Sequence, residues 1–200
     1  KKLDLIKKSC IVLNMEAIKK IYLNKVGKVI LITLLGTALL TVSAKIKIPF
    51  YPVPMTMQTF VVLFLGIMLG SKIGLLTISL YLFEGIFGLP VFAGTPEKGI
   101  GIIYFTGPTM GYLIGFLVTA YLAGSFKYNK GIGDTFLKLL FSVSFIYILG
   151  MIWLGILIGW EKPIFKLGAQ PFLLAELFKI LLILFLIPSL LKLKKLIKII

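Results

Sequence analysis

The 200-residue chain contains no histidine, and all 22 of its basic residues are lysine. The absence of histidine excludes His-ligated metals, histidine-ligated haem and catalytic triads with a histidine base. One cysteine, Cys10, leaves no partner for an intramolecular disulfide and no cysteine cluster. The seven acidic residues are scattered along the chain, which argues against a carboxylate metal cage. We therefore predict neither a cofactor nor a metal site.

Charge is also scarce. Only 14% of the residues are charged, 59% are hydrophobic, and the mean hydropathy is +1.07. A soluble domain does not carry so few charges on so much apolar surface. The composition indicates a polytopic helical membrane protein. The net charge of +15 suits anionic lipid headgroups, because the lysines lie beside hydrophobic runs.

The hydrophobic runs predict an all-α fold with six transmembrane helices. The predicted spans are residues 28–44, 57–69, 74–87, 108–126, 136–159 and 171–191. The second and third are short for a bilayer that needs roughly 20 apolar residues, and such spans are typical of transporters that enclose a cavity. Residues 1–27 are expected to form a cytoplasmic amphipathic segment, residues 28–191 the membrane domain, and residues 192–200 a basic cytoplasmic tail.

Lysine placement predicts the orientation. With the N-terminus inside, sixteen lysines fall in inside segments and five in outside loops. This asymmetry favours both termini in the cytoplasm. It also gathers the unusual polar residues in the outer half of the membrane.

Glu176 and Lys179 are the only charges between Pro171 and Pro188. A charge at mid-membrane costs about 2.5–3.5 kcal/mol, so such residues are candidates for function. Their spacing of three places both on one helix face. They either neutralise each other or hold a small polar solute, the carboxylate accepting N–H groups and the ammonium binding an anion.

Small residues recur at every fourth position in three segments. Glycine ladders at 66, 70 and 74 and at 107, 111 and 115 permit close helix approach. The ladder of Thr33, Thr37 and Thr41 lies on the first span, which precedes every predicted ligand residue. We expect this threonine face to contact a partner helix. The alternative is that the threonines bond their own carbonyls four residues earlier and pack inside the bundle.

Four stretches together resemble the BioY family of biotin transporters, the substrate-binding S components of energy-coupling factor (ECF) uptake systems. They are KIKIPFYPVPMTMQTF (45–60), LYLFEGIFGLPVFAG (80–94), TPEKGIGIIYFTGPTMGYLIGF (95–116) and GWEKPIFKLGAQPFLLAELFK (159–179). The sequence departs from the family pattern in two places. Met110 stands where glycine is usual, and Ala175-Glu176 replaces a usual Gly-Asp.

The resemblance implies a multi-pass protein of the bacterial cytoplasmic membrane that binds biotin from outside. It also implies partners, namely a transmembrane coupling protein with two cytoplasmic ATPases. The chain itself has no GxxxxGK[ST] motif, so energy must come from another chain or from a gradient.

The chemistry of biotin suits the candidate residues. Glu176 would accept the ureido N–H groups, and Lys179 or Lys98 would bind the valerate or the ureido oxygen. Aromatic walls for the thiophane ring are expected from Phe92, Tyr104 and Tyr112. The helix start at Thr109 offers free backbone N–H groups. Glu84 is either a second acceptor or a local backbone cap, while Thr56 and Gln58 are expected to cap a helix.

Three other functions stay open at this point. A membrane-embedded transferase would need a base or metal site that the sequence does not provide. The same receptor architecture tuned to another vitamin is compatible with Glu176 and Lys179. A stand-alone facilitator without an ATPase partner is the third.

Overall fold

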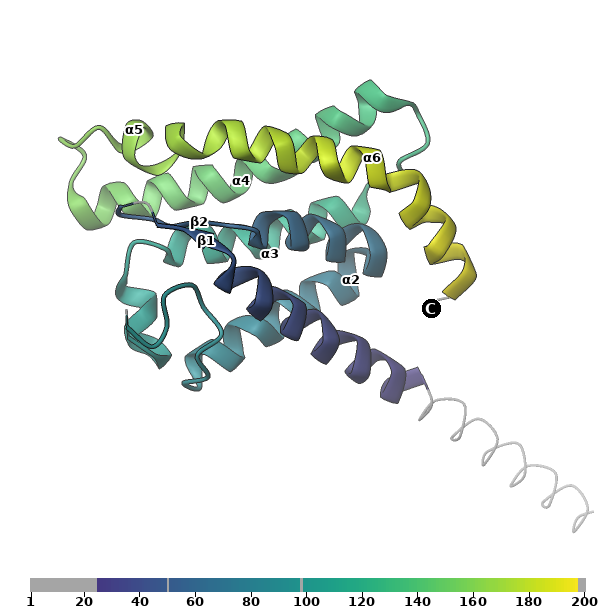
Figure 1. Cartoon of the computed structure of the whole chain (residues 1–200), viewed down its shortest axis with the longest axis horizontal. Helices are drawn as coiled ribbons and strands as arrows, with labels where there is room; N and C mark the ends of the chain where they lie inside the picture. Colours follow the sequence, from purple (N-terminus) through teal and green to yellow (C-terminus); the bar gives the residue numbers. More distant parts are fainter. Residues whose placement is uncertain (1–24, 50, 98, 198–200) are drawn as a thin grey trace, which may run out of the picture.

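The computed structural model describes residues 25–49, 51–97 and 99–197, and this part of the chain is mostly helical (Figure 1). An N-terminal helix covers Lys25–Lys45. A hairpin of β1 (Lys47–Ile48) and β2 (Met55–Thr56) follows it. The later elements are α2 (Gln58–Ile86), η1 (Gly101–Thr106), α3 (Met110–Ser125), α4 (Ile132–Ile158), α5 (Ile164–Gly168), η2 (Gln170–Phe172) and α6 (Leu173–Ile197).

Four described helices are long and apolar enough to cross a membrane. They are Lys25–Lys45, Gln58–Ile86, Ile132–Ile158 and Ile164–Lys195, and the apolar helix Met110–Ser125 is shorter. These elements support the prediction of a helical membrane protein. The count of six spans stays a prediction, and most of the segment expected at residues 1–27 lies outside the described residues.

Gly70 divides α2 inside the connection expected between the second and third spans. Its backbone angles, φ 79° and ψ 171°, lie where residues with a Cβ are rarely found. The helical geometry is broken at Gly70. Three residues before it, the carbonyl oxygen of Ile67 accepts a hydrogen bond from Lys194 of α6 at 2.7 Å. This contact anchors the end of α6 on α2. Accordingly, α6 continues to Ile197, into the segment expected as a tail.

The hairpin is the departure from the predicted all-α fold among the described residues. β1 and β2 pair antiparallel, with Lys47 opposite Thr56 and Ile48 opposite Met55. The connecting segment contains Pro52 and Pro54, which disfavour helix because proline lacks an N–H and restricts the residue before it. The chain therefore crosses this segment in extended form and reaches the start of α2 through β2.

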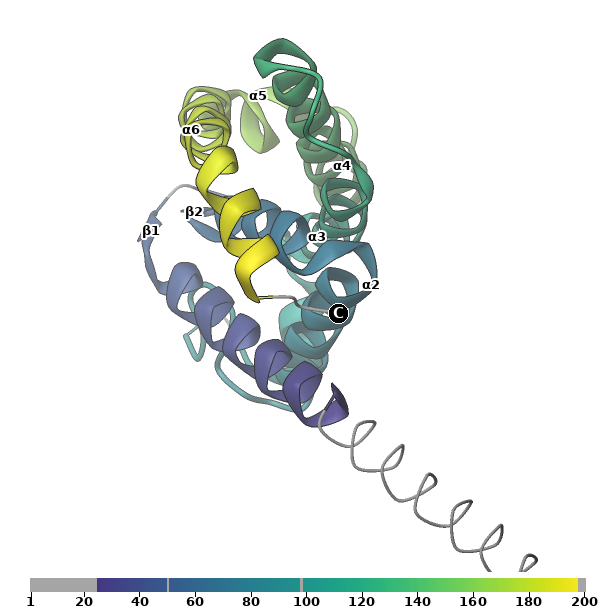
Figure 2. The same cartoon turned by 90° about the vertical axis from the view of Figure 1, so that its right-hand side faces the viewer.

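The helices pack closely around α2 and α3. α4 and α6 lie on one side of this central pair and the N-terminal helix lies on the other (Figures 1 and 2). A Cβ on Gly111 would lie 2.4 Å from the Leu149 oxygen, and one on Gly115 would lie 2.5 Å from the Ile146 Cα. These glycines let α3 and α4 approach to backbone contact, so this glycine ladder serves internal packing.

The threonine ladder of the N-terminal helix also faces the protein interior. Thr33 and Thr37 are each 3% exposed, and the hydroxyl of Thr37 donates to Oε1 of Glu84 at 2.9 Å. Thr33 and Thr41 bond carbonyl oxygens four residues earlier, at 3.0 and 2.9 Å. The prediction that this face stays open to a partner helix is therefore wrong for Thr33 and Thr37. The reason is that a carboxylate within a span needs a donor, and Thr37 supplies it.

Candidate functional site

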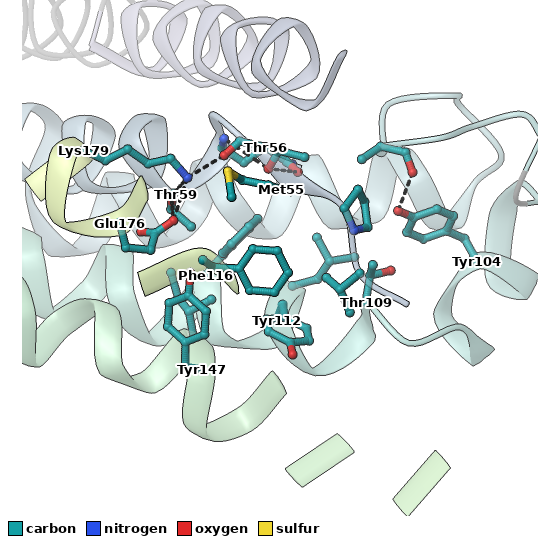
Figure 3. Close-up of a pocket in the computed structure, with 17 residues that line it drawn as sticks. Met55, Thr56, Thr59, Tyr104, Thr109, Tyr112, Phe116, Tyr147, Glu176 and Lys179 are labelled. Carbon is teal, nitrogen blue, oxygen red and sulfur yellow. Dashed lines mark hydrogen bonds and ion pairs between the residues drawn. The ribbon is translucent and has the colours of Figure 1, made fainter. Parts of the chain in front are cut away.

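A pocket opens where the hairpin, the loop after α2 and the starts of α3 and α6 meet (Figure 3). Its walls enclose about 520 Å³ of empty space, including the open mouth. Five predicted ligand residues line it: Tyr104, Thr109, Tyr112, Glu176 and Lys179. They come from two distant stretches of the sequence, residues 104–112 and 176–179, and the fold brings them to one cavity.

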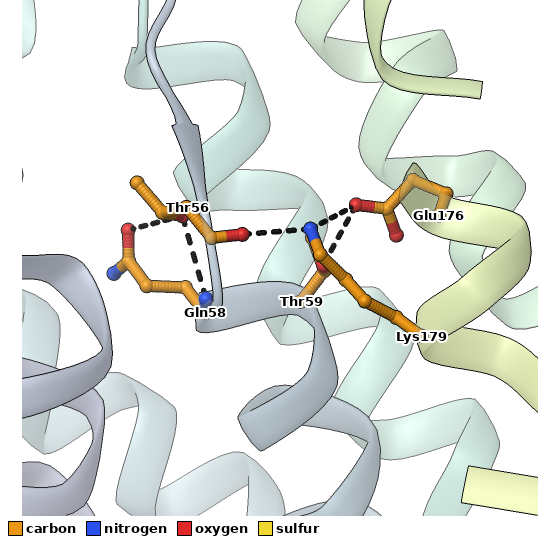
Figure 4. Close-up of polar contacts among 5 residues, drawn as sticks. All are labelled: Thr56, Gln58, Thr59, Glu176 and Lys179. Carbon is orange, nitrogen blue, oxygen red and sulfur yellow. Dashed lines mark hydrogen bonds and ion pairs between the residues drawn. The ribbon is translucent and has the colours of Figure 1, made fainter. Parts of the chain in front are cut away.

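The polar floor of the pocket is a compact set of hydrogen bonds around Lys179 (Figure 4). The ammonium Nζ donates to Glu176 Oε1 at 2.6 Å, to the Thr56 carbonyl oxygen at 2.7 Å and to Thr59 Oγ1 at 3.0 Å. Thr59 in turn donates to Glu176 Oε1 at 2.8 Å. Glu176 is 5% exposed and Lys179 7%, so both charges are buried. Such a pair is tolerable in a low-dielectric interior only with this kind of hydrogen bonding.

The two charged groups differ in the hydrogen-bonding capacity that remains for a ligand. An ammonium has three N–H donors, and all three of Lys179 have protein acceptors. Oε1 of the Glu176 carboxylate accepts two hydrogen bonds, whereas Oε2 is buried and accepts none from the described residues. A buried unpaired acceptor is costly unless a ligand or water supplies the donor. The floor therefore presents one carboxylate oxygen that accepts no hydrogen bond from the described residues, although the Tyr147 hydroxyl points toward Glu176 (Figure 3), and it presents no free ammonium donor.

Thr56, Thr59 and Gln58 belong to this floor, although sequence reasoning missed Thr59 and expected the other two only as caps. The amide of Gln58 donates to the Tyr81 hydroxyl at 2.8 Å, and Tyr81 donates to the Val91 oxygen at 3.0 Å. This chain of hydrogen bonds ties the start of α2 to the loop beyond it. The repeated polar residues in PMTMQT, directly before an apolar helix, were the available signal.

Aromatic side chains form the walls. The Tyr112 hydroxyl donates to the Gly168 oxygen at 2.8 Å, which fixes α3 against α5. Tyr147 packs edge-on to Tyr112 with ring centroids 6.2 Å apart and stacks with Phe172 at 6.3 Å. The hydroxyl end of Tyr147 points toward Glu176 (Figure 3). The sequence analysis missed Tyr147 and Phe172, because the sequence does not distinguish an aromatic residue that lines a pocket from one that packs elsewhere in an apolar segment.

Two of the predicted ligand residues that the structure describes, Phe92 and Glu84, do not line the pocket. Phe92 is 1% exposed and stacks behind Tyr104, with ring centroids 4.7 Å apart, so it supports the wall without forming its surface. Glu84 accepts from Thr37 on the other side of α2, so it is not at the site and acts as a structural acceptor. Lys98 lies outside the described residues.

Lys45 holds the loop that follows α2 and brings Ala93 to the pocket. In the sequence analysis Lys45 counted only toward the predicted topology. Its ammonium donates to the oxygens of Pro90 and Phe92 at 2.8 and 3.1 Å. The Tyr104 hydroxyl donates to the oxygen of Ala93 at 2.8 Å. Burial raises the pKa of Tyr104 above its ordinary value, so the hydroxyl keeps its proton and the bond. The loop thereby carries Ala93 to the pocket surface in a fixed position.

The pocket has the features of a binding site for a small molecule with few polar groups. The described residues contain no group of three or more His, Cys, Asp or Glu side chains that could hold a metal ion. The buried pair is neutral overall and presents a single acceptor. This arrangement suits recognition of an N–H donor on an otherwise apolar ligand.

Comparison with known proteins places these observations in a family. The BioY family model matches residues 15–196. The chain is 37% identical over 154 residues to a probable biotin transporter BioY of Pyrococcus horikoshii, covering 76% of this chain and 90% of the relative. It is 37% identical over 148 residues to the biotin transporter BioY of Thermotoga maritima, covering 72% and 84%.

A solved structure agrees with the sequence relatives. The crystal structure of the S-component for biotin from an ECF-type ABC transporter superposes with a TM-score of 0.69 at 27% identity, covering 84% of this chain and 93% of that one. The family match spans nearly the whole chain, and the fold of a solved relative matches most of it. The chain therefore belongs to the BioY family.

Proposed function

We propose that this chain is the biotin-binding component of an ECF-type uptake transporter, and that it is a transport component rather than an enzyme. The observation that carries the proposal is Oε2 of Glu176, a buried oxygen that accepts no hydrogen bond from the described residues and belongs to a residue lining an aromatic pocket. A ureido N–H of biotin supplies the missing donor. The relatives named as biotin transporters and the S-component structure support the same ligand.

The floor also favours one orientation of the ligand. Since the three N–H groups of Lys179 are occupied, the ammonium does not bind the valerate carboxylate. The ureido ring therefore lies deepest, and the thiophane ring lies between Tyr112 and Phe172. The valerate extends toward Thr109, where the first N–H groups of α3 have no acceptor within the helix and the helix dipole favours an anion.

The transport cycle requires other chains. We propose a six-helix membrane domain at residues 28–191 with both termini in the cytoplasm of a bacterial cell, as the lysine distribution favours. Biotin is captured from outside and delivered inward with a transmembrane coupling protein and two cytoplasmic ATPases. The absence of a Walker motif from the sequence is consistent with ATP hydrolysis on separate subunits.

Titration calorimetry on the purified chain tests the ligand. We expect biotin to bind with saturable 1:1 heat, and thiamine and riboflavin to give none at the same concentrations. A response to thiamine or riboflavin in place of biotin would assign the same architecture to another vitamin. Biotin uptake by the lone chain in liposomes without nucleotide would identify a stand-alone facilitator instead.

A further inference from the structure

Thr59 contacts both charges of the buried pair at once. Its hydroxyl oxygen accepts a hydrogen bond from the Lys179 ammonium at 3.0 Å, and the hydroxyl donates a hydrogen bond to Glu176 Oε1 at 2.8 Å (Figure 4). Thr59 is 7% exposed and lies at the start of α2, whereas the two charges lie on α6. The hydroxyl therefore joins the two helices through the polar floor of the pocket.

The consequence is an asymmetric carboxylate. Oε1 receives two donors, from Lys179 and from Thr59, while Oε2 receives none from the described residues. Lys179 alone can hold one oxygen and still let the carboxylate plane rotate about its terminal bond, which is a soft torsion. A second donor from a different helix fixes that plane.

We infer that Thr59 is a positioning residue that sets the specificity of the site: it orients Glu176 so that Oε2 alone is offered to the ligand. The inference rests on the proposed binding of biotin and deepens it. A fixed single acceptor selects ligands whose buried edge presents an N–H, such as cyclic ureas. It rejects ligands in which that nitrogen carries an alkyl group, because a buried acceptor without a donor pays its full desolvation cost.

The experiment measures Kd by titration calorimetry for biotin and for biotin methylated on a ureido nitrogen, with each nitrogen tested. Wild-type protein is expected to bind biotin and to discriminate strongly against at least one methylated form. Thr59→Val, which keeps the shape and removes the hydroxyl, is expected to weaken biotin binding roughly tenfold, the worth of about one hydrogen bond. The same variant should also reduce the ratio of the Kd for methylated biotin to the Kd for biotin. Thr59→Ser, which keeps the hydroxyl, should show the wild-type Kd for biotin and the wild-type Kd ratio.

Thr119→Val is the matched control. Thr119 is fully buried, and its hydroxyl donates to the Ser142 oxygen at 2.8 Å between α3 and α4, away from the pocket. Its loss should lower the unfolding temperature and leave Kd unchanged. A wild-type Kd and selectivity in Thr59→Val, or a tenfold loss in Thr59→Ser, overturns the inference. If Thr59→Val does not fold, Thr59→Ala, which also removes the hydroxyl, carries the same test against Thr59→Ser. Failure of wild-type protein to bind biotin overturns the proposed function instead.

Discussion

Glu176→Gln is the sharpest test of the pocket chemistry. The substitution keeps the length of the side chain and its oxygen for Lys179 and Thr59, but it removes the negative charge and the free carboxylate oxygen. A hydrogen bond to a charged group contributes about 1.5–3 kcal/mol. Losing it for one ureido N–H should raise the Kd for biotin by roughly 10- to 150-fold.

The assay is titration calorimetry on detergent-purified protein, with thermal unfolding measured in parallel. Glu84→Gln provides the control, since Glu84 is also a carboxylate within a span but accepts from Thr37 and lies away from the pocket. We expect Glu84→Gln to change unfolding and to leave Kd within about twofold, a difference of under 0.5 kcal/mol. If Glu176→Gln binds biotin as tightly as wild type, the carboxylate is not a ligand contact and the argument from Oε2 fails.

Further predictions concern the residues that hold the pocket together. Lys179→Met leaves a buried carboxylate unpaired and should cost about 3–5 kcal/mol of unfolding free energy, and the double variant with Glu176→Gln should recover part of this loss in chemical unfolding. Tyr112→Phe removes a donor from the Gly168 oxygen and should cost about 1 kcal/mol in the same assay. Gly115→Ala should cost about 1–3 kcal/mol by overpacking the α3–α4 contact, whereas Gly133→Ala, with nothing within 4 Å of the added Cβ, should leave the unfolding temperature unchanged. A Gly115→Ala protein as stable as wild type would contradict the close packing of α3 on α4.

The sequence predicted the elements of this fold well where hydrophobic length decides. Long apolar runs require helices in a membrane, because each backbone polar group must find its partner within the segment. The break at Gly70 was also accessible, since a glycine before Ser71 and Lys72 interrupts the apolar run. The hairpin was not, because two-residue strands carry no periodicity, and the hydrogen bond that holds β2 at Thr56 comes from Lys179, 123 residues away.

The site was predicted in part, and the pattern of success has a physical reason. Glu176 and Lys179 were identifiable because charge in hydrocarbon is rare. Their neighbours Thr59 and Tyr147 were not, because threonine and tyrosine are ordinary residues of membrane helices. Phe92 was expected at the pocket surface but lies one layer behind it, and a sequence does not distinguish these two layers of one aromatic cluster.

The two carboxylates within spans show what separates a structural acceptor from one available to a ligand. Each needs donors, and each finds one on another helix: Thr37 for Glu84, 47 residues away, and Thr59 for Glu176, 117 residues away. Glu84 is only partly buried. Glu176 is buried and lines the pocket, and its second oxygen accepts no hydrogen bond from the described residues. The cost of that unpaired oxygen is removed when a ligand brings an N–H, and the resulting gain is available only to ligands that have one. A charge in a span therefore indicates a functional residue when the fold leaves part of it unsatisfied, and this property depends on contacts between distant segments that the local sequence does not contain.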